Sequence, residues 1–384
     1  MKKILALFTL FFTISLIGQL TIKDTLTMNK TSVKRSITVS LPASYNKDKT
    51  KTYPLLIVLD GDYLLAPFEG VLRYGSYWDD LPEMILVGID QNTNEERFDD
   101  SETDDAGLPK EKGAAFFEFV GATLIDYIND KYRINNLKII AGQDVTAGYL
   151  NFFLYKDAPI FNAYISLSPE FANNMESRLI DRLQAINQPI FYYVATADGD
   201  TKAMKDKTTV FNNAIKQINM ATLNYKYEEL KETSHYSMVL KAIPNALYYF
   251  FESYQPITTN EFQNKIVVLN EGYVAYLKAR YEKTEKTLHY KIPVRYNDFK
   301  AIYAAIMKNK AYNELEELAQ EANKNYPKSM LGDFYLASYY EQKGDLKRAI
   351  KTYLNAFQRE PIGDLDKDKM INKSDDLRAK MDKQ

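Results

Sequence analysis

The sequence lacks cysteine altogether and contains only two histidines among its 384 residues. Without cysteine the chain has no disulfides, no cysteine-ligated metal and no lipid-modified cysteine anchor. It also offers no histidine pair suited to zinc, and no glycine-rich loop of the kind that cradles phosphate. We therefore expect neither a metal nor a cofactor.

An excess of charge of one sign is missing as well. Forty-nine basic residues against fifty-one acidic ones leave a net charge of -2. This balance gives no support to nucleic-acid binding or to strong attraction to a membrane surface. We expect a small molecule or a protein as the partner. The apolar content of 46% can bury a sizeable core, and the length suits one large domain and a smaller one.

A basic start and a short apolar run open the chain. Met1-Lys2-Lys3 precede the run from Ile4 to Ile17, which is too short to span a membrane and remain there. This pattern predicts a secretory signal peptide over residues 1–18, cleaved after Gly18. A retained anchor helix is the alternative. We expect an exported protein, periplasmic or extracellular, with no membrane span after cleavage.

Short continuous apolar runs alternate with helical patterns through the first two thirds of the chain. The runs cover residues 55–59, 84–89, 137–141, 161–167 and 191–195, and residues 36–41 alternate like a half-buried strand. Continuous runs suit strands that are covered on both faces, as in a parallel sheet. Between these runs, apolar residues recur at helical spacing from Phe116 to Ile128, and a second helical pattern runs from Ala147 to Tyr155. The alternation predicts a doubly wound, mostly parallel α/β domain over residues 19–256.

The pattern changes after Pro256. Residues 257–297 are predicted as a linker and connecting helix, and residues 298–384 have helical spacing with no strand signal. At a shift of 34 residues, Ala322 pairs with Ala356 and Pro327 with Pro361, and 34 is the tetratricopeptide period. We expect a small all-helical, tetratricopeptide-like domain that packs on the α/β domain or on a protein partner. A helical hairpin without repeat ancestry is the alternative.

A strand, a sharp turn and a helix are predicted around Gly142-Gln143-Asp144-Val145-Thr146-Ala147. A Gly-x-Ser-x-Gly elbow exposes a nucleophilic serine on such a turn, because small residues let the strand and the helix approach closely. Here an aspartate stands in the place of the serine. Gly142 and Ala147 are small, but Thr146 is not.

The other parts of a hydrolytic site follow in the order nucleophile, acid, histidine. Asp198 and Asp200 come after one strand and His235 after another, and the sequence alone does not separate the two acids. The loop after the strand at 55–59 supplies Gly61 and Asp62 as backbone donors for an oxyanion, and Val145 supplies a further one. A structural histidine and ordinary Asp-Gly turns are the competing interpretations.

The segment from Asn94 to Asp105 carries seven carboxylates and one arginine. It lacks the spacing and the closing glutamate of a calcium-binding EF-hand loop. We predict a solvated loop here.

These segments together resemble the putative esterase family of α/β-hydrolases, which includes ferric-enterobactin esterases, esterase D and feruloyl esterases. The likeness covers about residues 30–256 and rests on residues 59–62, 81–89, 140–142, 161–169 and 234–237. The resemblance implies a secreted ester hydrolase with His235 as its histidine and Asp200, or else Asp198, as its acid. The family's elbow begins Gly-His-Ser, so Gln143 and Asp144 depart from it.

The aspartate leaves three outcomes open. Loss of the nucleophile removes most of the rate enhancement of a triad, which predicts an impaired or changed ester hydrolase. Alternatively, Asp144 attacks an sp³ carbon, as in haloalkane dehalogenases and epoxide hydrolases, and His235 activates water. In the third outcome the Asp144 carboxylate accepts hydrogen bonds from Gly61 or Asp62 and Val145 and pairs with His235, which plugs the site. The competing function is a non-catalytic module that binds a ligand or a protein through the α/β domain and the helical tail.

Overall fold

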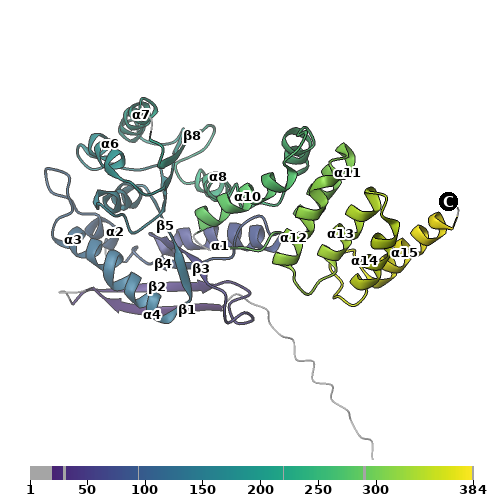
Figure 1. The fold of residues 1–384 in the computed structure, drawn as a ribbon. Coiled ribbons are helices and arrows are strands. Elements are labelled where there is room, and N and C mark those ends of the chain that lie inside the picture. Colours follow the sequence, from purple (N-terminus) through teal and green to yellow (C-terminus); the bar gives the residue numbers. More distant parts are fainter. Residues whose placement is uncertain (1–19, 29–31, 94, 219, 289–290, 383–384) are drawn as a thin grey trace, which may run out of the picture. The chain divides into compact units, whose positions relative to one another are not determined.

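The computed structural model describes residues 20–28, 32–93, 95–218, 220–288 and 291–382. The predicted signal peptide lies outside the described residues. The chain forms two compact units (Figure 1). Within the described ranges, the first unit comprises residues 20–73, 83–134 and 138–235, and the second comprises residues 74–82, 135–137 and 236–382.

An eight-stranded sheet organises the first unit, in the order β1-β2-β4-β3-β5-β6-β7-β8. β1 and β2 pair antiparallel, as do β2 and β4, and all other neighbours are parallel. The strands are β1 (Leu20–Thr27), β2 (Lys34–Leu41), β3 (Tyr53–Val58), β4 (Ile85–Ile89), β5 (Ile134–Gln143), β6 (Ala163–Leu167), β7 (Ile190–Ala197) and β8 (Leu223–Leu230). The predicted mostly parallel α/β fold is confirmed.

Burial explains why most strands were visible in the sequence and β1 was not. Every residue of β3, β4 and β6 is buried, so these strands are continuous apolar runs. β1 is an edge strand whose side chains are exposed or half-buried, and it has no such run. The helices between the strands are α1 (Gly61–Tyr77), α2 (Glu96–Asp100), α3 (Glu111–Glu118), α4 (Ile125–Lys131), α5 (Val145–Tyr149), α6 (Met175–Ala185) and α7 (Lys202–Lys216).

Two of these connections depart from regular α-helix. The predicted helix around Phe116–Ile128 is interrupted between α3 and α4 by a π-helical stretch, η1 (Phe119–Leu124). After α5 the chain tightens into a 3₁₀ helix, η2 (Leu150–Tyr155). The core of this unit contains apolar side chains from both the strands and the helices, including Phe116, Phe153 and Tyr164.

From residue 236 onward, the described part of the second unit is helical. Its elements are α8 (Val239–Phe250), α9 (Thr259–Glu261), the π-helix η3 (Phe262–Ile266), α10 (Tyr273–Leu288), α11 (Tyr296–Asn309), the 3₁₀ helix η4 (Tyr312–Glu314), α12 (Leu315–Asn325), α13 (Leu331–Gln342), α14 (Leu346–Ala356) and α15 (Lys367–Met381). In Figure 1 the helices from α11 to α15, green to yellow, follow one another side by side. Ala322 and Ala356, which the repeat comparison paired, are buried together with Ala349 and Tyr353 in one apolar core.

That core extends into the segment predicted as a linker and connecting helix. Ile266, Tyr273, Val274 and Leu277 are buried in it together with side chains of α11 to α15. Among the residues that the structure describes, no helix has the length and apolar character needed to cross a membrane.

Candidate active site

Asp144 occupies a strained turn between β5 and α5. Its backbone has φ 62° and ψ −122°, a conformation that residues other than glycine seldom adopt. Three backbone hydrogen bonds hold it. The Asp144 N–H donates to Leu167 O at 2.9 Å, and the Asp144 carbonyl accepts from the N–H groups of Gly148 and Glu170, each at 3.0 Å. The strand-turn-helix elbow is therefore formed, with an aspartate at its apex.

Close packing explains the glycines at this elbow. A Cβ on Gly142 would lie 2.8 Å from Thr146 Oγ1, and one on Gly148 would lie 1.9 Å from Glu170 O. Thr146 is accommodated in this tight turn because its hydroxyl has hydrogen-bond partners. Oγ1 lies 2.5 Å from Asp60 Oδ2 and 2.9 Å from Gln143 O, and it accepts from Gln143 N at 3.1 Å. The threonine thus ties the elbow to Asp60, which a glycine would not do.

Arg97 is the closest charged neighbour of the elbow carboxylate. From α2, its Nη1 bonds Asp144 Oδ2 at 3.1 Å, its Nη2 bonds Gln143 O at 2.8 Å, and its Nε bonds Asp60 Oδ1 at 2.7 Å. One guanidinium therefore bridges two carboxylates and the carbonyl before the elbow. Tyr63 adds a hydroxyl 3.2 Å from Nη2.

The charge of Arg97 is permanent in this setting. Burial lowers the pKa of its guanidinium, but the charge and hydrogen bond of Asp60 outweigh that effect, and the pKa is raised overall. Asp60 itself is fully buried at the start of α1. Burial raises the pKa of Asp60, while Arg97 and Thr146 act in the opposite direction. Removal of Arg97 would leave Asp60 without a compensating cation among the described residues.

A second set of polar bonds holds α2, the helix that carries Arg97. Asp100, at the end of α2, is fully buried and bonds Arg35 of β2 with Nε to Oδ2 at 2.9 Å and Nη2 to Oδ1 at 2.5 Å. Gln91 donates to Asp100 Oδ2 at 3.0 Å and accepts from Asp60 N at 3.0 Å. The prediction of a solvated loop over residues 94–105 is wrong for α2. Its arginine and its last aspartate point inward, because each finds a partner that lies far from it in the sequence.

On the other side of the site, His235 pairs with Asp200. His235 Nδ1 lies 2.8 Å from Asp200 Oδ1, and Asp200 Oδ2 accepts from Ser168 Oγ at 2.9 Å and from Ala197 N at 2.8 Å. Asp198 turns away, and its Oδ2 accepts from Glu232 N at 2.7 Å. The structure therefore brings Asp200 to the histidine and keeps Asp198 apart from it.

The surroundings of His235 raise its proton affinity. The hydrogen bond to Asp200 raises the pKa of His235, burial opposes this rise, and the charge of Asp144 adds to it. Burial raises the pKa of Asp200, but the bonds from His235, Ala197 and Ser168 outweigh it and the pKa is lowered overall. Gln143, which precedes the elbow aspartate, donates through Nε2 to His235 O at 2.9 Å. The elbow and the histidine loop are thus joined directly.

The predicted oxyanion donors begin two helices. Gly61 is the first residue of α1, and its close packing is strict, since a Cβ there would lie 2.7 Å from the backbone carbon of Gly88. Val145 is the first residue of α5. No hydrogen bond of the described residues runs from Gly61, Asp62 or Val145 to the Asp144 carboxylate. The carboxylate bonds Arg97 instead, so the plugged site is wrong in the form predicted.

Comparison with known proteins agrees with this fold. A sequence profile of the family described as Putative esterase matches residues 29–211. An uncharacterised protein from Capnocytophaga ochracea, known from its crystal structure, is 30% identical, and the match covers 94% of this chain and 100% of that one, with a TM-score of 0.85. The chain belongs to the putative esterase family.

Two more distant structures share the esterase-family fold. An IroE-like serine hydrolase from Shewanella oneidensis is 17% identical with a TM-score of 0.61, over 79% of this chain and 99% of that one. The BES protein from Bacillus cereus is 21% identical with a TM-score of 0.51, over 60% and 95%. At these identities the likeness concerns the fold alone. No curated protein matched the chain.

A cavity of about 140 Å³ lies beside the elbow of this esterase-family chain. Four of its ten lining residues are aromatic; the full lining is Phe98, Ser101, Thr103, Val145, Gly148, Tyr149, Phe152, Glu170, Phe171 and Ala172. A similar volume inside a protein holds one small ring. Within the described ranges, no group of three or more histidine, aspartate or glutamate side chains is arranged to hold a metal ion.

The sequence patterns did not predict that Arg97 lies in the site or that Asp100 forms a buried pair with Arg35. The one signal available was the single arginine within a run of carboxylates. Such a residue balances the charge of its neighbours whether the segment is solvated or buried, so it did not indicate which of the two applies here.

Proposed function

We propose that this protein is an exported esterase-family member in which Asp144 stands in the nucleophile position and ester hydrolysis is impaired. The α/β domain then acts chiefly as a binding module for an ester-like ligand. The observation that carries this proposal is the ion pair between Arg97 and Asp144, 3.1 Å between Nη1 and Oδ2.

Two physical arguments support the loss of acyl transfer. A carboxylate is a weak nucleophile toward an ester carbonyl, and its product would be an anhydride. Its negative charge would also repel an oxyanion that develops beside it, whereas catalysis needs hydrogen-bond donors there. Arg97 compensates that charge and fixes the side chain, which weakens Asp144 further as a nucleophile. His235 and Asp200 would remain as an acid–base pair with no serine to activate.

A second candidate is attack by Asp144 on an sp³ carbon. It is favoured by the state of the second carboxylate oxygen, since Arg97 bonds Oδ2 and no hydrogen bond of the described residues engages Oδ1. Oδ1 would form a bond to the carbon as a halide leaves. His235 would then take a proton from water, whose oxygen attacks the Asp144 carbonyl carbon and releases the alcohol.

Export and the role of the tail belong to the proposal as well. The basic start and apolar run of residues 1–18 support secretion to a periplasm or to the medium. The 34-residue spacing and the buried positions of Ala322 and Ala356 support a tetratricopeptide-like tail that docks a protein partner. Cell fractionation and mass spectrometry of the mature N-terminus test the first point, with Gln19 as the expected first residue.

A chromogenic short-acyl ester and a haloalkane distinguish the candidates. The native protein, Asp144→Ser and Asp144→Asn are assayed with both substrates, and folding is checked by circular dichroism. We expect ester hydrolysis only from Asp144→Ser. Halide release by the native protein that is lost in Asp144→Asn would establish the aspartate nucleophile. Ester hydrolysis by the native protein as fast as by Asp144→Ser would refute the proposal.

A further inference from the structure

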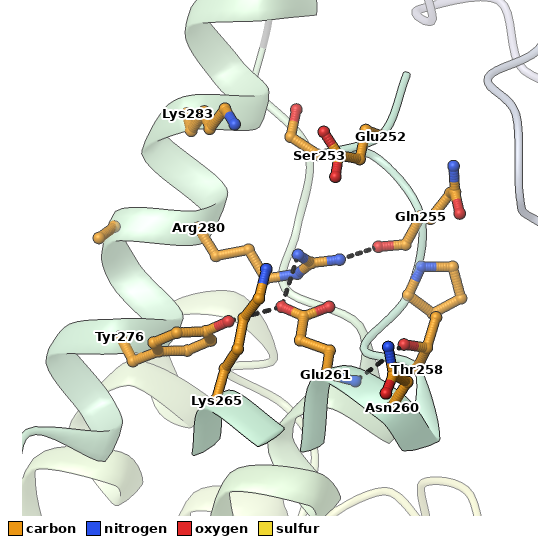
Figure 2. A pocket seen from close by; sticks show the side chains of 12 residues that line it. Glu252, Ser253, Gln255, Thr258, Asn260, Glu261, Lys265, Tyr276, Arg280 and Lys283 are labelled. Atoms are coloured by element: carbon orange, nitrogen blue, oxygen red, sulfur yellow. Dashed lines mark hydrogen bonds and ion pairs between the residues drawn. The ribbon is translucent and has the colours of Figure 1, made fainter. Parts of the chain in front are cut away.

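A second cavity lies wholly within the helical unit. It has a volume of about 480 Å³ and is formed by the segment after α8, by α9 and η3, and by α10 (Figure 2). This volume falls in the range of small-molecule sites. None of the residues that line it belongs to the elbow.

One wall of this cavity is rigidly bonded. Arg280 Nη1 and the Tyr276 hydroxyl each lie 2.8 Å from Glu261 Oε1, and Arg280 Nη2 bonds Gln255 O. The side chains of Arg280 and Glu261 are each only 13% exposed. Burial, together with the bond to Glu261, raises the pKa of Tyr276 to about 12, so its hydroxyl stays neutral. Figure 2 shows the Arg280 guanidinium reaching from α10 toward Gln255, above Glu261.

Basic side chains outnumber acidic ones in the lining, with Lys265, Arg280 and Lys283 against Glu252 and Glu261. Arg280 is already paired with Glu261, so Lys265 is the cation that would chiefly meet a negative charge on a ligand. Lys265 projects from the π-helix η3 and has no ion pair within the described residues, and Figure 2 shows it extending toward Arg280. π-Helical turns of this kind are frequent at functional sites.

The neutral lining specifies the ligand further. Ser253, Gln255, Thr258 and Asn260 line the cavity with hydroxyl and amide groups, whereas its only fully apolar side chains are Pro256 and Ala279. A ligand that fits must therefore carry both negative charge and several hydrogen-bonding groups. Arg280 uses two of its five N–H donors on the wall, which leaves others for a carboxylate.

We propose that this cavity binds a small hydroxylated carboxylic acid. The carboxylate is held by Lys265 and Arg280, and the hydroxyls bond Glu252 and the neutral polar side chains around it. The site is independent of the esterase elbow and of any activity there.

Glucuronate and glucose form a matched pair for the test, because they share a hydroxylated ring and differ by one carboxylate. Inorganic phosphate serves as an anion without hydroxyls. Binding of each to the full chain is measured by calorimetry and ligand-observed NMR, for the native protein and for Lys265→Gln. The control is Lys308→Gln, since Lys308 is exposed on α11 and lines no part of this cavity.

We expect saturable binding of glucuronate, none of glucose, and weaker binding of phosphate. Lys265→Gln should weaken glucuronate binding about tenfold, as loss of a charge-assisted hydrogen bond does, and Lys308→Gln should leave it unchanged. Absence of saturable glucuronate binding, equal affinity for glucose, equal or tighter binding of phosphate, or equal loss in both variants would overturn the proposal.

Discussion

Two carboxylates of the same site differ in the partner that each has been given. Asp144 at the elbow pairs with Arg97, and Asp200 pairs with His235. An arginine keeps its charge at every accessible pH, whereas a histidine gains and loses a proton near neutrality. The Asp200 pair therefore has a capacity for proton transfer that the Asp144 pair lacks. The identity of the paired cation thus determines whether a carboxylate of this site can take part in proton transfer.

The largest expected effect comes from changing the acid that pairs with His235. In the Asp144→Ser background, we expect Asp200→Asn to remove most of the ester hydrolysis gained, by about 10³-fold or more, because His235 then loses the acid that fixes its tautomer. Steady-state kcat for a chromogenic ester measures it. Asp198→Asn in the same background is the matched control and should change kcat little. Equal losses in the two variants would contradict the pairing seen here.

Arg97→Met tests the other pair through stability. It leaves the fully buried Asp60 with an uncompensated charge, so we expect the free energy of unfolding to fall by about 3 kcal/mol or more near neutral pH. The pKa of Asp60 is already raised by burial and should rise further without Arg97. A carboxyl with a raised pKa binds more protons when folded, so the stability of the variant should increase as the pH falls.

Urea denaturation at about pH 5 and pH 8 measures this dependence. The double variant Asp60→Asn/Arg97→Met should recover part of the loss, since it removes the stranded charge. A deficit that is the same at both pH values, and that the second substitution does not relieve, would show that Arg97 acts through packing alone.

Thr146→Val isolates the hydroxyl that ties the elbow to Asp60. We expect the free energy of unfolding to fall by about 1–3 kcal/mol, because the buried Asp60 oxygen and Gln143 N–H lose a partner. Thr123→Val is the control. The Thr123 hydroxyl is buried, and within the described structure it has no hydrogen-bond partner, so its removal should be neutral or stabilising. Equal losses in both variants would argue against the role given to Thr146.

The smallest expected effect is on the proton affinity of His235. The charge of Asp144 contributes to its raised pKa, so Asp144→Asn should lower that pKa, by less than about one pH unit for a screened charge. NMR titration in a His289→Gln background follows a single imidazole, since the chain has two histidines. A pKa that does not move, or that rises, would mean that Asp144 exerts no field at the histidine.

The same shift has a defined consequence for stability. The folded pKa of His235 lies above its ordinary value of 6.5. The bond to Asp200 therefore contributes fully below that value, and its contribution is lost as the pH rises through the folded pKa.

Local sequence patterns were enough to predict most of the fold and part of the candidate site. Buried strands such as β3 and β4 are apolar without interruption, and the elbow and His235 follow strands in a fixed order, so both were predictable. The roles of Arg97 and Asp100 were not predictable, because their charged partners lie 37 to 65 residues away in the chain and only folding brings them together. The segment 257–297 was predicted as a connection, yet Tyr273 and Leu277 are buried in the helical core.

The central claim is that the elbow and its acid–base pair are intact apart from the side chain at position 144. Reaction with a fluorophosphonate, followed by intact and peptide mass spectrometry, tests it directly, since this reagent modifies a serine only when a histidine activates it. We predict a stable adduct at position 144 in Asp144→Ser, none in the native protein or Asp144→Asn, and none when His235→Ala is added to Asp144→Ser. A folded Asp144→Ser variant that stays unmodified would contradict the account.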